Sequence, residues 1–332
     1  MVVAGRSLEY WISQIPSKDQ SKSENAIRAV MEFGPDRAYQ AVPVIVERLR
    51  HNSPGKQVDV SVRVNGAIAL GYILGGYKGA DHKVIKDAVS VLRRFLTDNQ
   101  TIVRYRGAQA LGRIGTDAKD TIPEVINVVK DPATWETRQA AAIALGQIAL
   151  DEVHGPSLAV LNALYSALGD GSVQVRLAAI QALTRLGGPV NATLRLRLVR
   201  ALDPVAYKDT EPTVKIWAHM AVMSITRTVD KDRIDVIAQL MVHPDLAARA
   251  QAIQALGTIG KDAKITIPRL MKALNDPEPT VVGWAIWALG RMGPAASGAL
   301  IELERIQTDM SQPETLRKLA DEAVNEIKGK KK

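Results

Sequence analysis

The sequence signature that decides the fold is clearest in the stretch Val103-Arg104-Tyr105-Arg106-Gly107-Ala108-Gln109-Ala110-Leu111-Gly112-Arg113-Ile114-Gly115. The same pattern returns at residues 137–148, 175–186, 248–259 and 281–292. Its apolar and small residues recur three and four positions apart, which places them on one face of a helix. A helix that recurs along the chain predicts a repeat protein.

The spacing of the repeats follows from one reference position, which is Leu111 in the stretch above. Its equivalents are Phe33, Leu70, Leu145, Leu183, Met223, Leu256, Leu289 and Val324. Consecutive members lie 33 to 41 residues apart, which is the length of one helical hairpin. The reference residue belongs to the second helix of each hairpin, and Pro43, Pro123 and Pro268 open first helices, where proline costs no hydrogen bond.

These patterns predict an all-α solenoid of about nine helical hairpins that forms a single domain over residues 1–332. The expected hairpins are 7–34, 38–74, 82–115, 117–149, 156–187, 189–228, 230–260, 262–293 and 294–328, and a basic tail follows at 328–332. Two turns inside hairpins are longer than the others, at residues 51–59 and 203–212. We expect both to be surface loops and possible contact sites.

An aspartate in the turn of several hairpins is followed by an arginine. Asp98 precedes Arg104 by six residues, and Asp170 precedes Arg176 by six. Such an aspartate can cap the second helix, and the arginine can face an aspartate of the same or the next hairpin. The pattern predicts a ladder of ion pairs that holds the hairpins in register, so we assign these arginines a structural role.

The Val-Arg-x-x-Ala-x-x-Ala-Leu-Gly-x-Ile-Gly stretch, with an aspartate turn ahead of it, resembles the HEAT-repeat superfamily, particularly its short phycobilin-lyase-like subtype. The resemblance covers residues 7 to 328. It implies a right-handed superhelix with first helices on the convex side and second helices on the concave side. It implies no single function, because such arrays serve as scaffolds, transport adaptors, lyase subunits and occasionally enzymes.

Composition excludes several classes of site. The chain has no cysteine, so disulfides, thiolate metal sites and cysteine nucleophiles are excluded. Its net charge of +8 includes four lysines at its end, Lys328, Lys330, Lys331 and Lys332, which leaves about +4 for the body. No apolar run of about 18 residues is present, so we expect no membrane span, and a cytoplasmic location by default with the compartment unknown.

The sequence gives little support for an enzymatic function. The five histidines, His51, His82, His154, His219 and His243, form no His-Glu pair of the di-iron hydroxylase kind, and we expect His219 to be a packed structural residue. A DNA glycosylase-like activity needs a carboxylate near the aromatic residues, which the pattern lacks. A phycobilin-lyase-like role rests on the repeat subtype alone. We therefore predict no catalytic residue, no metal and no cofactor.

The surface that remains for a partner is one face of the second helices. Positions five and two before the reference residue, and two after it, share that face. From the second hairpin onward they are Asn65, Ile68, Tyr72, Arg106, Gln109, Arg113, Ala140, Ile143, Gln147, Ala178, Gln181, Arg185, Ala218, Ala221, Ile225, Gln251, Gln254, Thr258, Trp284, Trp287, Arg291, Leu319, Glu322 and Glu326. Four separated arginines are too few for a phosphate track, so a protein or peptide is favoured over nucleic acid.

The candidate partner-binding residues on this face are Trp284, Trp287, Arg291, Gln251, Gln254, Arg106, Gln109, Arg113, Gln181 and Arg185. The tryptophan pair stands where other hairpins carry mostly Ala, Gln or Ile. Tryptophan is enriched at binding hot spots, so the pair suggests an anchor pocket for a partner side chain. The alternative is that both pack beneath the last hairpin, against Leu316 and Leu319.

Overall fold

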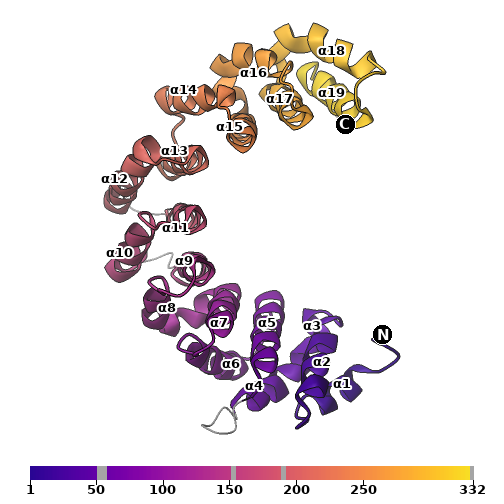
Figure 1. Ribbon diagram of the computed structural model, residues 1–332, viewed down its shortest axis with the longest axis vertical. Coiled ribbons are helices and arrows are strands. Elements are labelled where there is room, and N and C mark those ends of the chain that lie inside the picture. Colours follow the sequence, from indigo (N-terminus) through magenta and orange to yellow (C-terminus); the bar gives the residue numbers. More distant parts are fainter. Residues whose placement is uncertain (51–57, 151–154, 188–191, 330–332) are drawn as a thin grey trace. The chain divides into compact units, whose positions relative to one another are not determined.

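A computed structural model describes residues 1–50, 58–150, 155–187 and 192–329 (Figure 1). Over these ranges the chain is helical, and the only strand-like feature is an isolated bridge between Val3 and Arg6. The predicted all-α solenoid of helical hairpins is confirmed. The described residues fall into two compact units, residues 1–194 and 195–332. The expected single domain stays a prediction.

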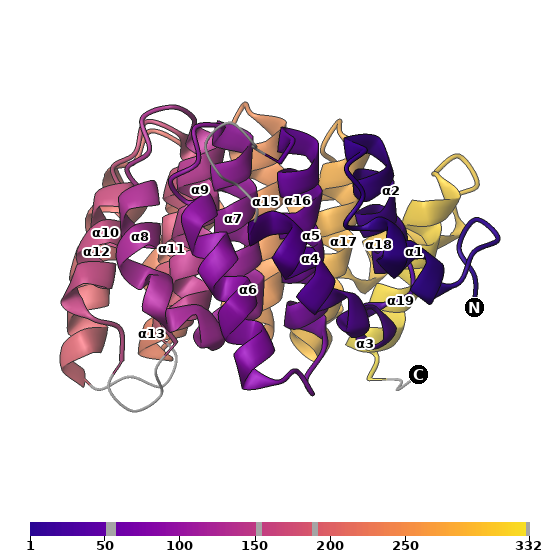
Figure 2. The same ribbon diagram turned by 90° about the horizontal axis from the view of Figure 1, so that it is seen from below.

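Unit 1 has two layers of helices. The first helices are α1 (Leu8–Gln14), α4 (Val42–Arg50), α6 (His82–Phe95), α8 (Ile122–Val128) and α10 (Leu158–Ala167), with the short α3 (Pro35–Ala38) after the first hairpin. The second helices are α2 (Gln20–Met31), α5 (Val60–Gly76), α7 (Thr101–Ile114), α9 (Trp135–Ile148) and α11 (Val173–Leu186). Each of α5, α7 and α9 packs against the next second helix, and α4, α6 and α8 cover them on one side (Figure 2).

Unit 2 repeats this arrangement. Helix α12 (Ala192–Lys208) begins at the boundary, and the first helices that follow are α14 (Lys231–Gln239), α16 (Ile267–Ala273) and α18 (Leu300–Thr308). The second helices are α13 (Pro212–Thr226), α15 (Leu246–Ile259), α17 (Pro279–Met292) and α19 (Glu314–Ile327). Several hairpins are joined by 3₁₀ turns, such as residues Gly115–Thr121 and Gly260–Thr266.

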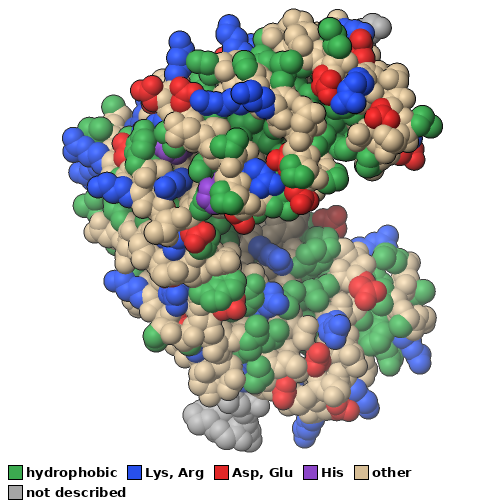
Figure 3. Space-filling view, turned by 45° about the horizontal axis from the view of Figure 1, so that its top comes forward, with side chains coloured by type: hydrophobic (Ala, Val, Ile, Leu, Met, Phe, Trp, Pro, Cys, Tyr) green, Lys and Arg blue, Asp and Glu red, His purple; other side chains and the backbone are tan. Residues whose placement is uncertain are grey.

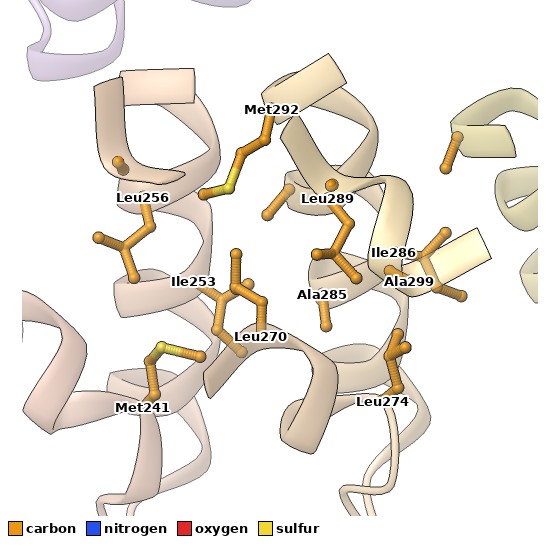
Figure 4. Packing of buried hydrophobic residues seen from close by; sticks show 14 of the residues in the cluster. Met241, Ile253, Leu256, Leu270, Leu274, Ala285, Ile286, Leu289, Met292 and Ala299 are labelled. Carbon is orange, nitrogen blue, oxygen red and sulfur yellow. The ribbon is translucent and has the colours of Figure 1, made fainter. Parts of the chain in front are cut away.

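The core lies between the two layers of helices. In unit 2, Ile253 and Leu256 of α15 face Leu270 of α16 and Leu289 of α17 (Figure 4), and all four side chains are fully buried. Small residues let the second helices approach: a Cβ atom added at Gly71 would lie 2.7 Å from the Ala110 Cα. The repeated Leu and Ala positions of the sequence are therefore the packing contacts of the stack.

The predicted ladder of ion pairs is present at the hairpin turns. Among the described residues its pairs include Arg63–Asp98, Arg104–Asp131, Arg138–Asp170 and Arg249–Asp276. Arg104 shows the geometry: its Nε lies 2.5 Å from Asp131 Oδ2 of the next hairpin, and its Nη1 donates to the Asp98 carbonyl of its own turn at 2.7 Å. Each arginine thereby ties one turn to the next.

The predicted loop at residues 203–212 is wrong, because α12 continues to Lys208 with Pro204 inside it. Proline inside a helix costs about 3 kcal/mol. Here Leu198, Leu202 and Ala206 recur every four residues and are all fully buried, so the helix face is held by packing through the proline. Residues 51–57 of the other long turn, and 330–332 of the basic tail, lie outside the described residues.

Candidate functional site

The second helices leave one face outside the core, and we call its three positions in each hairpin the open face. On α7 they are Arg106 and Gln109, which are half-buried, and Arg113, which is exposed. Arg106 Nη1 donates to Gln109 Oε1 at 2.8 Å, and Gln109 Nε2 donates to the Tyr105 hydroxyl at 2.7 Å. Arg106 and Gln109 are thus engaged within their own helix, whereas Arg113 extends beyond it.

Farther along unit 1, Gln181 and Arg185 of α11 are exposed, as predicted for the open face. A depression of about 660 Å³ lies at the C-terminal ends of the second helices. It is lined by Pro35, Gly71, Tyr72, Gly75, Gly76, Lys78, Gly112, Arg113, Ile114, Gly115, Thr116, Gln147, Leu150 and Arg185. The structure therefore brings Arg113 and Arg185 to one hollow, together with Lys78, which the sequence analysis did not single out.

In the sixth hairpin the predicted open-face residues are wrong. Ala218, Ala221 and Ile225 are 0 %, 3 % and 1 % exposed, so all three belong to the core. The reference position is Val222 instead of Met223, and the one-residue slip turned the whole set inward. With Val222 as reference, the open face of α13 is Trp217, Met220 and Ser224, all partly or fully exposed.

The sequence does contain the signal for this register. Helices α13 and α17 both begin Pro-Thr-Val, at Pro212 and Pro279. Aligning these starts places Trp217 opposite Trp284. Repeat spacing alone could not reveal this, because the hairpins differ in length.

The open face of unit 2 is aromatic. Trp217 is 43 % exposed, and its Nε1 donates to Gln251 Oε1 of the next second helix at 3.2 Å. Trp284 occupies the same position one helix further on, so tryptophan, glutamine and tryptophan follow one another on α13, α15 and α17. Gln254 is half-buried and Arg291 is exposed on the same face.

The Trp284–Trp287 pair combines the two roles considered from sequence. The rings meet edge to face with centroids 5.4 Å apart, and both are half-buried against the core of unit 2. They also line a pocket of about 550 Å³. The other lining residues are Pro279, Thr280, Gly283, Pro313, Thr315, Leu316 and Leu319. Leu316 and Leu319 therefore form pocket wall instead of a lid over the indoles.

His219 is a packed residue, as predicted. It is fully buried on α13, its Nδ1 lies 3.3 Å from Arg233 Nη1, and the Tyr207 ring stands edge-on at 4.8 Å. Burial, with the nearby Arg233 guanidinium, lowers the pKa of the imidazole to about 4. The histidine is therefore neutral near pH 7.

Among the described residues, no group of three or more His, Asp or Glu side chains is placed so that it could hold a metal ion. Among the helices that the structure describes, none is long and apolar enough to cross a membrane.

The fold and this face define an α-solenoid repeat protein. The HEAT-repeat family matches residues 56–146, 89–184, 122–218 and 234–324, which together make up more than half of the chain. The chain belongs to the HEAT-repeat family. A comparison with curated protein sequences found no match.

Solved structures share the fold at low identity. A designed armadillo repeat protein in complex with peptide (KR)4 is 20% identical over 66% of this chain and 100% of that chain, with a TM-score of 0.51. Kap121p bound to Pho4p is 14% identical over 96% of this chain and 37% of that chain, with a TM-score of 0.64. Kap121p bound to Nup53p is 14% identical over 96% and 41%, with a TM-score of 0.61. This chain thus spans less than half of Kap121p.

Proposed function

We propose that this protein is an interaction scaffold that binds an extended segment of a partner protein across the open face of unit 2. The observation that carries the proposal is the row Trp217, Gln251 and Trp284, which stands on three successive second helices. Each indole is only partly covered, although the core-facing side chains of the same helices are buried.

Exposed indoles suit recognition of a peptide. Covering a tryptophan removes a large apolar surface from water, which favours binding. Tryptophan is also the residue type most enriched at hot spots. The pocket beside Trp284 and Trp287 can receive an apolar side chain, and amides such as Gln254 can bond to an extended backbone. Neighbours in fold support the idea, since a designed armadillo repeat protein was solved with a peptide and Kap121p with Pho4p.

Nucleic acid is a poorer fit to this face. In the described part of unit 2, its open-face cation is Arg291, and α19 adds Glu322 and Glu326. On the side of the molecule shown in Figure 3, lysine and arginine side chains are scattered among apolar and acidic ones. Phosphate tracks commonly need six or more cationic contacts. No observation at the described site favours glycosylase-like or lyase-like chemistry, so we propose no enzymatic activity.

The test is selection of peptides from a random display library on the full chain, followed by affinity measurement on variants. The double variant Trp217→Ala/Trp284→Ala should weaken binding of the selected peptides by about 30-fold, which corresponds to about 2 kcal/mol. The matched control is Trp135→Ala, because Trp135 is 38 % exposed but lies at the start of α9 in unit 1. Circular dichroism confirms that each variant is folded.

Two results would reject the proposal. Selected peptides that bind the double variant as tightly as the wild type would place the binding site elsewhere. A failure to select any peptide, together with salt-sensitive binding of single-stranded RNA or DNA, would favour the nucleic-acid alternative.

A further inference from the structure

The hollow at the C-terminal ends of α5, α7, α9 and α11 has an unusual charge. Lys78, Arg113 and Arg185 reach it from three different segments of unit 1. None of the described residues that line it is acidic. No ion pair joins any of these three cations to a described carboxylate.

This contrasts with the arginines at the opposite ends of the same helices. Arg104 and Arg138 each reach an aspartate of the following hairpin, within 2.5 and 2.7 Å. In unit 1, the charges of these two stacking arginines are therefore neutralised by aspartates. Arg113 and Arg185 make no comparable contribution to the packing between hairpins, because both side chains are exposed.

A helix C-terminus accounts for part of this pattern, since its partial negative charge favours a nearby cation. A single cation in the last turn of each helix is enough to interact with this partial charge, and the interaction does not reach beyond that turn. It does not explain Lys78, which lies in the loop after α5, or why the hollow gathers three full charges around one space. The positive charge left over faces solvent and any bound partner.

We propose that this hollow binds an acidic segment of a partner protein. The inference rests on the proposed function as a peptide-binding scaffold, and it adds the chemistry of the partner. A guanidinium pairs with a carboxylate through two parallel hydrogen bonds, so Arg113 and Arg185 each offer a place for an Asp or Glu side chain. A volume of about 660 Å³ accommodates a few such side chains.

The residues between the two arginines suit a polypeptide. Gln147 lies on α9, between the helices that carry Arg113 and Arg185, and its side-chain amide packs on Gly112, where a Cβ would come within 2.3 Å of Oε1. The Gln147 amide and the exposed ring of Tyr72 add polar and apolar contacts for a peptide. Three cations over one hollow fall short of the six or more contacts of a typical phosphate track, which disfavours nucleic acid.

The probe is a fluorescein-labelled peptide of about twelve residues that alternates Glu and Ala, titrated with the full chain at about 50 mM salt, where exposed charge pairs are weakly screened. The double variant Arg113→Gln/Arg185→Gln should bind about tenfold more weakly. The control Lys86→Gln/Arg94→Gln removes the same charge from α6, whose two side chains are exposed on the other layer. It should keep the wild-type affinity.

Three outcomes would overturn the inference: no binding of the acidic peptide to the wild type, equal losses in both double variants, or preferential binding of single-stranded RNA that depends on Arg113 and Arg185. The outcome is separable from the proposed function. Trp217→Ala/Trp284→Ala should leave the acidic peptide bound, whereas Arg113→Gln/Arg185→Gln should leave the indole-dependent peptides bound. Loss of acidic-peptide binding alone would reject the hollow and keep the aromatic face.

Discussion

The open faces of unit 1 and unit 2 are built on the same helix pattern but carry different chemistry. In unit 1 the face holds arginine, glutamine and the half-buried Ile143 from α7 to α11, because the predicted Ala140 and Ala178 are only 3 % exposed and belong to the core. In unit 2 it holds three tryptophans and, on α19, two glutamates. The residues beneath these faces are alike: Leu111 and Leu256 are both fully buried. Packing determines the residues that point into the core, so the hairpins of the two units differ mainly at the residues that point outward. One repeat scaffold can therefore present two kinds of surface.

The turn edges of the two units differ as well. In unit 1 the ion-pair ladder continues through α5, α7 and α9. In unit 2 the ladder geometry is found at Arg249–Asp276, while Val282 takes the arginine position of α17. Arg233 contributes from a first helix instead, with its Nη2 2.7 Å from Asp203 Oδ1. The first unit should therefore depend more strongly on charge at its turns.

The largest expected effect tests this difference. Asp98→Ala removes the partner of Arg63, whose side chain is 2 % exposed. A buried charge without its partner costs about 3–5 kcal/mol. We expect a loss of that size in urea unfolding, and a smaller one for Asp276→Ala, since both side chains of Arg249–Asp276 are more exposed, at 13 % and 12 %.

The control for that comparison is Asp87→Ala, because the Arg50–Asp87 pair is exposed at 40 % and 42 %. An exposed pair contributes less than about 1 kcal/mol. Equal losses for Asp98→Ala and Asp87→Ala would show that burial of the ladder contributes nothing to stability.

The next effect belongs to unit 2 and depends on pH. The unfolded chain protonates His219 near its ordinary pKa of about 6.5, whereas the folded chain does so only near a pKa of about 4. Between these values the unfolded state binds more protons, so the free energy of unfolding falls as the pH falls. The loss from this one residue is at most about 3 kcal/mol.

His219→Gln should flatten that dependence between about pH 6.5 and 4, whatever its effect at pH 7. Chemical unfolding at several pH values gives the slope for each protein. Identical slopes for wild type and variant would mean that folding does not lower the pKa of the His219 imidazole.

Much of this architecture could be predicted from the sequence, because repeats average out local ambiguity. The Leu111 pattern identified the second helices, and the Asp98 and Arg104 spacing identified the ladder, since both are imposed by contacts that recur in every hairpin. The failures came where one hairpin departs from its neighbours. The Met223 reference position is wrong by one residue because the preceding hairpin differs in length. Pro204 suggests a turn by its residue type, but the helix continues through it because Leu202 is buried.

The candidate site was less predictable for a different reason. The burial of a side chain near the end of a stack depends on the neighbouring helix. The sequence pattern of its own helix therefore cannot predict that burial. Trp284 and Trp287 illustrate this, since both are half-buried by contacts with α15 and α19. Lys78 lies in the loop after α5, outside the repeated helix pattern, and the packing of α5 on α7 brings it to the same hollow as Arg113.

The smallest expected effect concerns the way that unit 2 makes room for an indole. A Cβ at Gly257 would lie 2.3 Å from Trp287 Cζ3 and 3.0 Å from the Ala288 Cα. In unit 1 the equivalent Gly112 faces the side-chain amide of Gln147. Alanine stabilises a helix by up to about 1 kcal/mol relative to glycine, whereas overpacking costs about 1–3 kcal/mol.

Gly257→Ala should therefore destabilise the protein by about 1 kcal/mol and turn the Trp287 ring away from Trp284. The near-ultraviolet circular dichroism of the coupled indoles should weaken, and peptides selected on the open face of unit 2 should bind less tightly. An unchanged spectrum with higher stability would show that α15 can shift without moving the tryptophan pair, so that the short distance between Gly257 and the Trp287 ring does not fix the aromatic face of unit 2.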